Sequence, residues 1–390
     1  MNVILFALRN ASAAFFILGV SCLTLFAQGP LPPPGTPGPT MKTLDQIDTH
    51  VAQVGETRIP IDTVHTPGDA SNLFIINKPG SYYLTANITG ASGKRGILIL
   101  AGNVTVDLNG YALFGVPGAL DGILAPANFD NLRIHNGSVQ NWGSSGITAN
   151  VFASQFDHLR VSGNSGPGLT GCTASVLSDI TAEKNSIGIT IGLGCALTRC
   201  AAFNNQYVGI QTASSSILTH CAVLENGSEG ISAGDFCTIR DCTAQSNATD
   251  GIRAGQSCIV TNCASTKNGS GTTGAGILTD IRASVSGCTA IGNKGDGIVF
   301  SGDSVVLNNH ASTNGGAGFH DLGSASRIEG NVARENIGLG ISAATIDTVI
   351  RNNSGANGNG AANNQYGPTA GANWGPVGTA NNATSPWANF

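Results

Sequence analysis

Five ionisable residues recur at one position of an internal repeat, in a chain that carries little charge elsewhere. Lys, Arg, Asp and Glu make up 11% of the sequence, about half of their usual share. The five residues are His158, Asp179, Arg199, His220 and Asp241. If the repeats stack as neighbouring strands, roughly 5 Å separates adjacent members, so Asp179 can pair with Arg199 and His220 with Asp241. Such a strip offers a base, an acid and a cation, which could hold an anionic sugar and move a proton on it.

We therefore predict a candidate site on this strip, with two sets of roles. His220, Asp241 and Arg199 are the predicted catalytic residues. His158, Asp179 and Arg199 are the predicted substrate-binding residues, and the aspartate beside Arg199 is expected to stay ionised. The alternative is a solvated edge on which opposite charges are paired to avoid repulsion, and this alternative predicts no ligand. No metal site is predicted, because the chain has no Cys-x-x-Cys pair and its aspartates are scattered.

The strip depends on a repeat of about 21 residues in which a Gly-apolar pair, an asparagine and a cysteine keep their spacing. In the stretch CAVLENGSEGISAGDFCTIRDCTAQSNATDGI, Cys221 is followed by Cys242 and Asn226 by Asn247. Short runs such as CTIRDCTA alternate apolar and polar residues between these markers, which is the period of a strand. We predict an all-β, single-stranded parallel β-helix, a solenoid of about 12 coils. Its core should contain one buried isoleucine file: Ile189, Ile210, Ile231, Ile252 and Ile298.

Glycine and asparagine are expected at the bends between the strands. Glycine before isoleucine suits a tight bend, because glycine tolerates a positive φ angle. Asparagine tolerates the left-handed region too, and stacked asparagine side chains can hydrogen-bond along the axis of the solenoid.

The segment TIRDCTAQSNATDGI resembles the right-handed parallel β-helix repeat of the pectate-lyase-like superfamily, and the resemblance extends over about Gly96 to Asn357. The stretch from Phe74 to Gly115 is similar to the first segment of many exported bacterial β-helix proteins of unassigned function. The resemblance implies either a surface, structural or glycan-binding β-helix or a carbohydrate-active enzyme on an acidic polysaccharide. The enzyme would be a polysaccharide lyase working by β-elimination, a glycoside hydrolase or an epimerase. It implies no cofactor, except Ca²⁺ in the case of a lyase.

The motifs that would support an enzyme are missing from the sequence. Polygalacturonase-type hydrolases carry NTD, DD, GHG and RIK, and pectate lyases carry a catalytic arginine in an RxPxxR context; none of these occurs here. Enzymes on this scaffold usually wall their groove with long loops, whereas insertions between these repeats are short. We therefore favour the binding or structural function over the enzyme.

Cysteine occupies the place where the family usually has an inward-pointing asparagine at a bend. The cysteines at this place are Cys200, Cys221, Cys242, Cys263 and Cys288, and Asn309, Asn331 and Asn352 follow them in later repeats. A second file contains Cys237 and Cys258. We expect buried free thiols, which pack as small apolar groups; vertical disulfides are the alternative, since stacked Cα atoms fall within disulfide range.

The chain divides into five predicted segments. Residues 1–27 read as a signal peptide, because an apolar stretch from Ala13 to Ala27 follows Arg9; an uncleaved anchor and lipidation at Cys22 are the alternatives. Residues 28–40 form a Pro-rich linker, and residues 41–93 an N-terminal cap with the first strands. Residues 94–357 form the β-helix, and residues 358–390 a low-complexity C-terminal cap or tail.

Composition also bears on partners and location. The formal net charge is −5, which provides no basic surface for nucleic acid. The signal peptide predicts a secreted or extracytoplasmic protein with no stable membrane span after cleavage. A polysaccharide or a cell-surface glycan is the expected partner.

Overall fold

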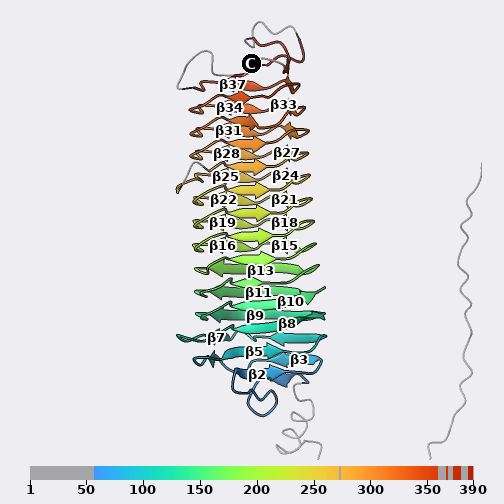
Figure 1. The fold of residues 1–390 in the computed structure, drawn as a ribbon, viewed down its shortest axis with the longest axis vertical. Helices are drawn as coiled ribbons and strands as arrows, with labels where there is room; N and C mark the ends of the chain where they lie inside the picture. Colours follow the sequence, from blue (N-terminus) through green and yellow to red (C-terminus); the bar gives the residue numbers. More distant parts are fainter. Residues whose placement is uncertain (1–56, 272–273, 359–365, 368–371, 379–384, 390) are drawn as a thin grey trace, which may run out of the picture. The chain divides into compact units, whose positions relative to one another are not determined.

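The computed structural model describes residues 57–271, 274–358, 366–367, 372–378 and 385–389. The predicted signal peptide (1–27) and Pro-rich linker (28–40) lie outside the described residues. From Thr57 onward the chain forms one compact unit, in which short strands stack turn upon turn in chain order (Figure 1). All pairings between the named strands are parallel, as in a β-solenoid.

Two parallel sheets make up the wall of the solenoid. Sheet B contributes one strand to each turn: β2 (Asn72–Ile76), β5 (Arg95–Ile99), β8 (Ile123–Asp130), β10 (Ile147–Phe152), β12 (Leu169–Thr170), β14 (Ile189–Ile191), β17 (Ile210–Thr212), β20 (Ile231–Ala233), β23 (Ile252–Ala254), β26 (Ile277–Thr279), β29 (Ile298–Phe300), β32 (Phe319–Asp321), β35 (Ile341–Ser342) and β38 (Tyr366–Gly367).

Sheet A has two rows of strands. The first row is β1 (Ile59–Pro60), β3 (Gly80–Tyr83), β6 (Val104–Asp107), β9 (Leu132–Gln140), β11 (Gln155–Ser162), β13 (Val176–Glu183), β15 (Ala196–Thr198), β18 (Ile217–Thr219), β21 (Thr238–Arg240), β24 (Ile259–Thr261), β27 (Ser284–Ser286), β30 (Val305–Leu307), β33 (Arg327–Glu329), β36 (Thr348–Ile350) and β39 (Asn373–Trp374). The second row is β4 (Ile88–Thr89), β7 (Ala112–Phe114), β16 (Ala201–Phe203), β19 (Ala222–Leu224), β22 (Thr243–Gln245), β25 (Ala264–Thr266), β28 (Thr289–Ile291), β31 (His310–Ser312), β34 (Val332–Arg334) and β37 (Asn353–Gly355). The long strands β9, β11 and β13 span both rows.

The solenoid has 14 sheet-B strands, and hence about 14 turns, where the sequence predicts about 12. The two additional strands are β2 and β38, one near each end. Neither begins with the Gly-apolar pair by which the repeats were counted. The all-β parallel architecture and the repeat length are confirmed.

The isoleucine file is confirmed by the strand register. Ile189, Ile210, Ile231, Ile252 and Ile298 occupy equivalent positions of sheet B, with Ile277 between the last two. All six side chains are fully buried. Burial of one such side chain contributes roughly 1.5–3 kcal/mol, so this file is a large part of what holds successive turns together.

The glycine before each isoleucine has a different role from the predicted one. Gly230, for example, is not in the positive-φ region. A Cβ atom added to Gly230 would lie 2.6 Å from Gly251 O and 2.6 Å from Asn247 Nδ2. Glycine is therefore required here because the next turn approaches the backbone closely, and not because of its freedom in φ.

Left-handed conformations occur instead at three corners of each regular turn. At each corner one residue has a positive φ angle, near +55° where it is not glycine. The residue that follows it points into the core. Glu225 (φ 54°) precedes buried Asn226, His220 (54°) precedes Cys221, and Phe236 (57°) precedes Cys237. Each corner thus turns the chain and places one inward side chain in a column.

An asparagine ladder fills the column at the corner that leads back to sheet B. Asn226 donates its backbone N–H (3.1 Å) and its side-chain Nδ2–H (2.9 Å) to Asn247 Oδ1 in the next turn. Asn247 Nδ2 donates in turn to Val223 O (3.3 Å) in the preceding turn. The same pattern runs without a break through ten residues: Asn164, Asn185, Asn205, Asn226, Asn247, Asn268, Asn293, Asn314, Asn336 and Asn357. The predicted hydrogen bonding of stacked amides is confirmed.

The cysteine ladder occupies the column between the two rows of sheet A, as predicted. The Cys221 backbone N–H donates to Cys242 Sγ (3.4 Å), and the Cys288 N–H donates to Asn309 Oδ1 (2.8 Å), where asparagine continues the column. The hydrogen bond to Cys221 and burial raise the pKa of the Cys200 thiol. All nine cysteines in the described part of the chain are buried and free of disulfide bonds.

The third column, at the corner that precedes the first row of sheet A, mixes serine with cysteine and ends in an acid. Ser216 donates its N–H to Cys237 Sγ (3.4 Å), and Ser326 donates its N–H to Asp347 Oδ1 (2.9 Å). Asp347 is fully buried. Burial, together with the nearby Asp321 carboxylate, raises the pKa of Asp347 to about 6. Asp321 is also buried, and within the described residues its Oδ2 atom has no hydrogen-bond partner.

We predict that replacing Asn247 by alanine destabilises the solenoid by about 2 kcal/mol, because the Asn226 N–H then loses its acceptor in the core. Asn204→Gly is the control. It removes an equally large amide at an exposed corner, and glycine adopts φ 55° without strain. Chemical denaturation followed by circular dichroism compares the midpoints. Equal midpoints for the two variants would show that the ladder contributes no stability.

We predict that the buried Asp347 carboxyl group makes stability fall as the pH rises. The folded-state pKa of Asp347 lies above its usual value of 3.8, so its stabilising contribution is complete below about pH 4 and is lost as the pH rises through 6. Asp321→Asn replaces one of the two carboxylate oxygens, Oδ1 or the unpartnered Oδ2, with an N–H donor. This variant should gain about 1–2 kcal/mol at pH 8 and little at pH 4.5. A variant less stable than the parent at pH 8 would contradict this account of the pair.

Candidate functional site

The five strip residues lie at the corner between the two rows of sheet A, one on each of five successive turns. His158, Asp179, Arg199, His220 and Asp241 have φ angles of 53°, 55°, 53°, 54° and 54°. Each immediately precedes an inward residue, such as Cys200 after Arg199. The side chains of His158, Arg199 and His220 are more than half exposed. The corner therefore displays the strip to solvent.

The two pairs predicted on the strip lie next to each other, and of the two only Asp179 and Arg199 are hydrogen-bonded. Arg199 binds Asp179 in a two-point arrangement, with Nε 2.7 Å from Oδ1 and Nη2 2.8 Å from Oδ2. The hydrogen bonds from Arg199 lower the pKa of Asp179, so this carboxylate stays ionised as expected. His220 Nε2 lies 3.9 Å from Asp241 Oδ2. The structure thus brings the strip together as pairs.

The backbone supplies a second reason for the residue types on the strip. Asn, Asp and His are enriched among residues with positive φ, since their short polar side chains tolerate the left-handed region. Asn136 and Asn262 occupy the same column with φ angles of 62° and 54°. Arginine has no such preference. The positive φ angle of the corner therefore accounts for Arg199 less well than for the other strip residues.

A second charged column lies one residue earlier in the chain, and the sequence reasoning missed it. Asp107, His135 and Asp157 are in register on β6, β9 and β11. Arg133 binds Asp157 through Nε and Nη2, both at 2.9 Å. Burial opposes ionisation of Asp157, but hydrogen bonds from Arg133 and His158 outweigh it and lower the Asp157 pKa.

His135 is the half-buried imidazole of this column. Its Nδ1 atom lies 4.0 Å from Asp107 Oδ1, and Asp107 also accepts hydrogen bonds from Arg58 (2.5 Å) and Asn136 (3.0 Å). Burial, and next the charge of Arg133, lower the pKa of His135. This shift favours the neutral imidazole, which can accept a proton.

The two columns join into what we call the paired-charge network: Arg133, Asp157, His158, Asp179 and Arg199. His158 connects them, with Nδ1 3.1 Å from Asp157 Oδ2 and Nε2 3.9 Å from Asp179 Oδ2. The signal for the earlier column was present in RIHNG and FDHLR, where His135 and Asp157 directly precede the strip position. The longer N-terminal repeats obscured this alignment.

A groove of about 500 Å³ opens beside the network, where β6, β9, β11 and β13 begin. Thr105, Asn131, Gln155 and Val176 line it together with Arg133. Arg133 therefore belongs to both features, and a ligand in the groove would meet its guanidinium.

Two searches of the described residues concern metals and membranes. No group of three or more His, Cys, Asp or Glu side chains in the described ranges is arranged to hold a metal ion. The described part of the chain also contains no helix long and apolar enough to cross a bilayer.

The fold and the network define a parallel β-solenoid with a polar, paired-charge outer face. The family model described as right handed beta helix region matches residues 121–252 and 232–373. The chain therefore belongs to the right-handed β-helix family, and the predicted pectate-lyase-like fold is confirmed.

The chain is similar to several solved structures at low sequence identity. The A-module of the Azotobacter vinelandii mannuronan C-5 epimerase AlgE6 aligns with a TM-score of 0.56 at 15% identity, over 70% of this chain and 90% of that module. The Dettilon tailspike protein aligns with a TM-score of 0.48 at 14% identity, over 70% and 64% of the two chains. The Streptococcus pneumoniae surface protein and adhesin PfbA aligns with a TM-score of 0.41 at 12% identity, over 72% and 94%. No curated protein sequence matches the chain.

We predict that Arg133→Met destabilises the protein by about 2–4 kcal/mol, because it leaves the buried Asp157 carboxylate without its main partner. Arg199→Met is the matched control. Its partner Asp179 is more exposed than Asp157, so this change should cost about 1 kcal/mol or less. Denaturation midpoints at neutral pH measure both. If Arg199→Met costs as much as Arg133→Met, the burial of Asp157 does not decide the strength of the pair.

Proposed function

We propose that this protein binds an acidic polysaccharide along the paired-charge network, outside the cytoplasm. The observation that carries the proposal is the continuity of the network over four turns, from Arg133 through His158 to Arg199. An extended chain of sugars needs an extended row of polar contacts, and a solenoid supplies such a row at a regular spacing of roughly 5 Å.

The pairing prepares the arginines for a ligand. Each guanidinium has five N–H donors, and the contact with Asp157 or Asp179 engages its Nε and Nη2 atoms. The remaining donors can meet a sugar carboxylate or hydroxyl. Because the carboxylate already holds the guanidinium in place, less conformational freedom is lost on binding.

Two further observations support this proposal. The AlgE6 A-module, which has a similar fold, is a mannuronan epimerase, so this architecture can present a surface to a polyuronate. The apolar stretch from Ala13 to Ala27 reads as an export signal. Export would bring the protein into contact with cell-surface or extracellular glycans.

A second candidate function is proton transfer on the bound uronate, and His135 is the observation that favours it. A neutral imidazole can take the proton from the carbon next to the sugar carboxyl. The Arg133 guanidinium would offset the negative charge that develops on that carboxyl group. Departure of the glycosidic oxygen, protonated by an acid, would then give β-elimination, and delivery of a proton to the opposite face by a second acid would give epimerisation. His220 with Asp241 is the alternative acid–base pair for this chemistry.

Binding is tested by calorimetric titration of the mature protein with polygalacturonate and with polymannuronate. Arg199→Ala should weaken binding about tenfold, the loss expected for a charge-assisted hydrogen bond, and His220→Ala tests how far the site extends. Arg282→Ala is the control, since Arg282 is an exposed arginine at another corner with φ 58°.

Three outcomes separate the hypotheses. Wild-type affinity in both Arg199→Ala and His220→Ala would show that the strip is only a solvated edge. Loss of affinity in Arg282→Ala as well would indicate nonspecific attraction to positive charge. Ultraviolet absorbance of unsaturated uronates, or a change of sugar configuration seen by NMR, would indicate catalysis, and His135→Gln should then abolish it.

A further inference from the structure

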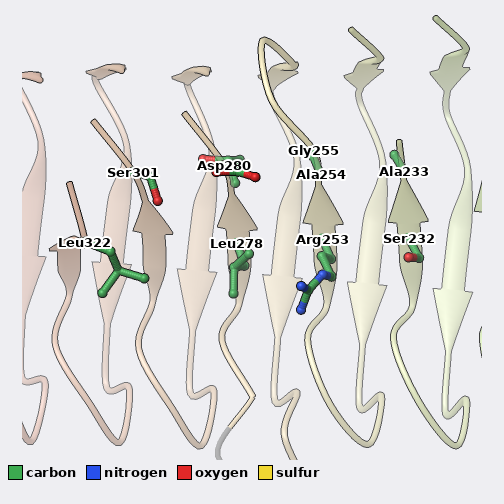
Figure 2. Close-up of a pocket in the computed structure, with 10 residues that line it drawn as sticks. Ser232, Ala233, Arg253, Ala254, Gly255, Leu278, Asp280, Ser301 and Leu322 are labelled. Carbon is green, nitrogen blue, oxygen red and sulfur yellow. The ribbon is translucent and has the colours of Figure 1, made fainter. Parts of the chain in front are cut away.

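A hollow opens on the outer face of sheet B (Figure 2), whereas the strands that carry the paired-charge network belong to sheet A. Its volume is about 350 Å³, at the lower end of the range for small-molecule sites. It opens over β20, β23 and β26. The residues that directly follow β23, β26, β29 and β32 also line it.

The repeat creates the hollow where two neighbouring corner positions carry glycine. Along the strands, Ser232, Arg253 and Leu278 are in register and face outward. Two residues later in their turns, Gly234, Gly255 and Asp280 stand at equivalent positions. A Cβ atom at Gly255 would lie 2.3 Å from Asp235 Oδ1 and 3.0 Å from Asp235 N, so a side chain there would crowd the preceding turn. The side-chain layer therefore has a gap at this point, between Arg253 and Asp280.

Polar groups of opposite charge stand at this gap. The Arg253 side chain is 53% exposed, and the Asp250 carboxylate lies 3.8 Å from its Nη1 atom. That distance exceeds hydrogen-bond length, so the pair engages the guanidinium only weakly. Asp280 Oδ1 accepts the backbone N–H of Ile281 at 2.8 Å, which orients the carboxylate while leaving it capacity to accept further bonds. Ser301 adds a hydroxyl to the lining.

Apolar groups complete the lining. Leu322, which follows β32, is 62% exposed, and Leu278 on β26, two turns earlier, is half-buried. In Figure 2 both leucine side chains lie on the outer surface together with Arg253. A pyranose ring has the matching surfaces, with C–H groups on one face and hydroxyl groups around its edge.

We propose that this hollow is a second glycan-binding site and that it takes a neutral mono- or disaccharide unit. Leu278 and Leu322 contact the C–H face of the ring, and Arg253 and Asp280 bind its hydroxyl groups. A neutral sugar is favoured over a uronate because the Asp280 carboxylate offsets the charge of Arg253. The site does not depend on the function proposed for the network, since it stands on the other sheet and uses other residues.

The test uses saturation-transfer NMR and calorimetry on the mature protein with four neutral disaccharides: cellobiose, maltose, lactose and mannobiose. We expect at least one of them to bind. Arg253→Ala and Asp280→Asn should each weaken that binding about tenfold, and Leu322→Ser should weaken it as well. All three residues are at the surface, and circular dichroism confirms that each variant is folded.

Two controls locate the site. Gln211→Ala alters an exposed outward residue of the same sheet, one turn before Ser232, and should leave binding unchanged. Arg199→Ala should also leave it unchanged. The proposal is overturned if none of the four sugars binds, or if binding persists in Arg253→Ala and Asp280→Asn. Binding that is lost in Gln211→Ala, or that occurs with uronates alone, would likewise overturn it.

Discussion

At the corners of this solenoid, a residue in the left-handed region leaves the next N–H pointing inward, beyond the reach of the strand ladders. A buried N–H without an acceptor is costly. The structure meets this requirement with a side chain from the following turn: Asn Oδ1 in one column, Cys Sγ or Asn Oδ1 in a second, and Ser Oγ or Cys Sγ in a third. This exchange between neighbouring turns is the interaction on which the rest of the structure depends.

The exchange also determines what the outside of the molecule can do. Because the side chain of one turn must reach the N–H of the turn before it, the turns cannot slip in register. Equivalent outward residues are then held in columns, and short polar side chains can form extended rows without long loops. The paired-charge network and the hollow over Gly255 both arise in this way. The network follows from two adjacent columns that carry several charged residues. The hollow follows from a third column, in which glycine leaves a gap between side chains.

Much of the fold could be predicted from the sequence, since the repeat carries its own register. The isoleucine file and the amide ladder follow from spacing, and the inward direction of the cysteines follows from the resemblance to the β-helix repeat. The role of Gly230 could not, because close approach by the next turn and freedom in φ both select glycine. The site was predicted in part. Asp179 and Arg199 were found by scarcity of charge, whereas Asp107 and His135 lie in longer repeats whose alignment needs the strand register. The positive φ angle of the corner also selects Asn, Asp and His. In the sequence alone, this backbone preference cannot be told apart from a functional site made of the same residue types.

Hydrogen exchange of the ladder amides tests the central claim most directly. If side chains of the next turn accept these N–H groups, the amide protons of Asn205, Asn226 and Asn247 should exchange as slowly as those of the buried strands, such as Ile231. In Asn247→Ala the Asn226 amide proton should exchange faster, while that of Asn205, whose acceptor is Asn226 Oδ1, should change little. Rapid exchange of all three in the unmodified protein would show that the ladder bonds are not maintained in solution, and the account of the fold would then be wrong.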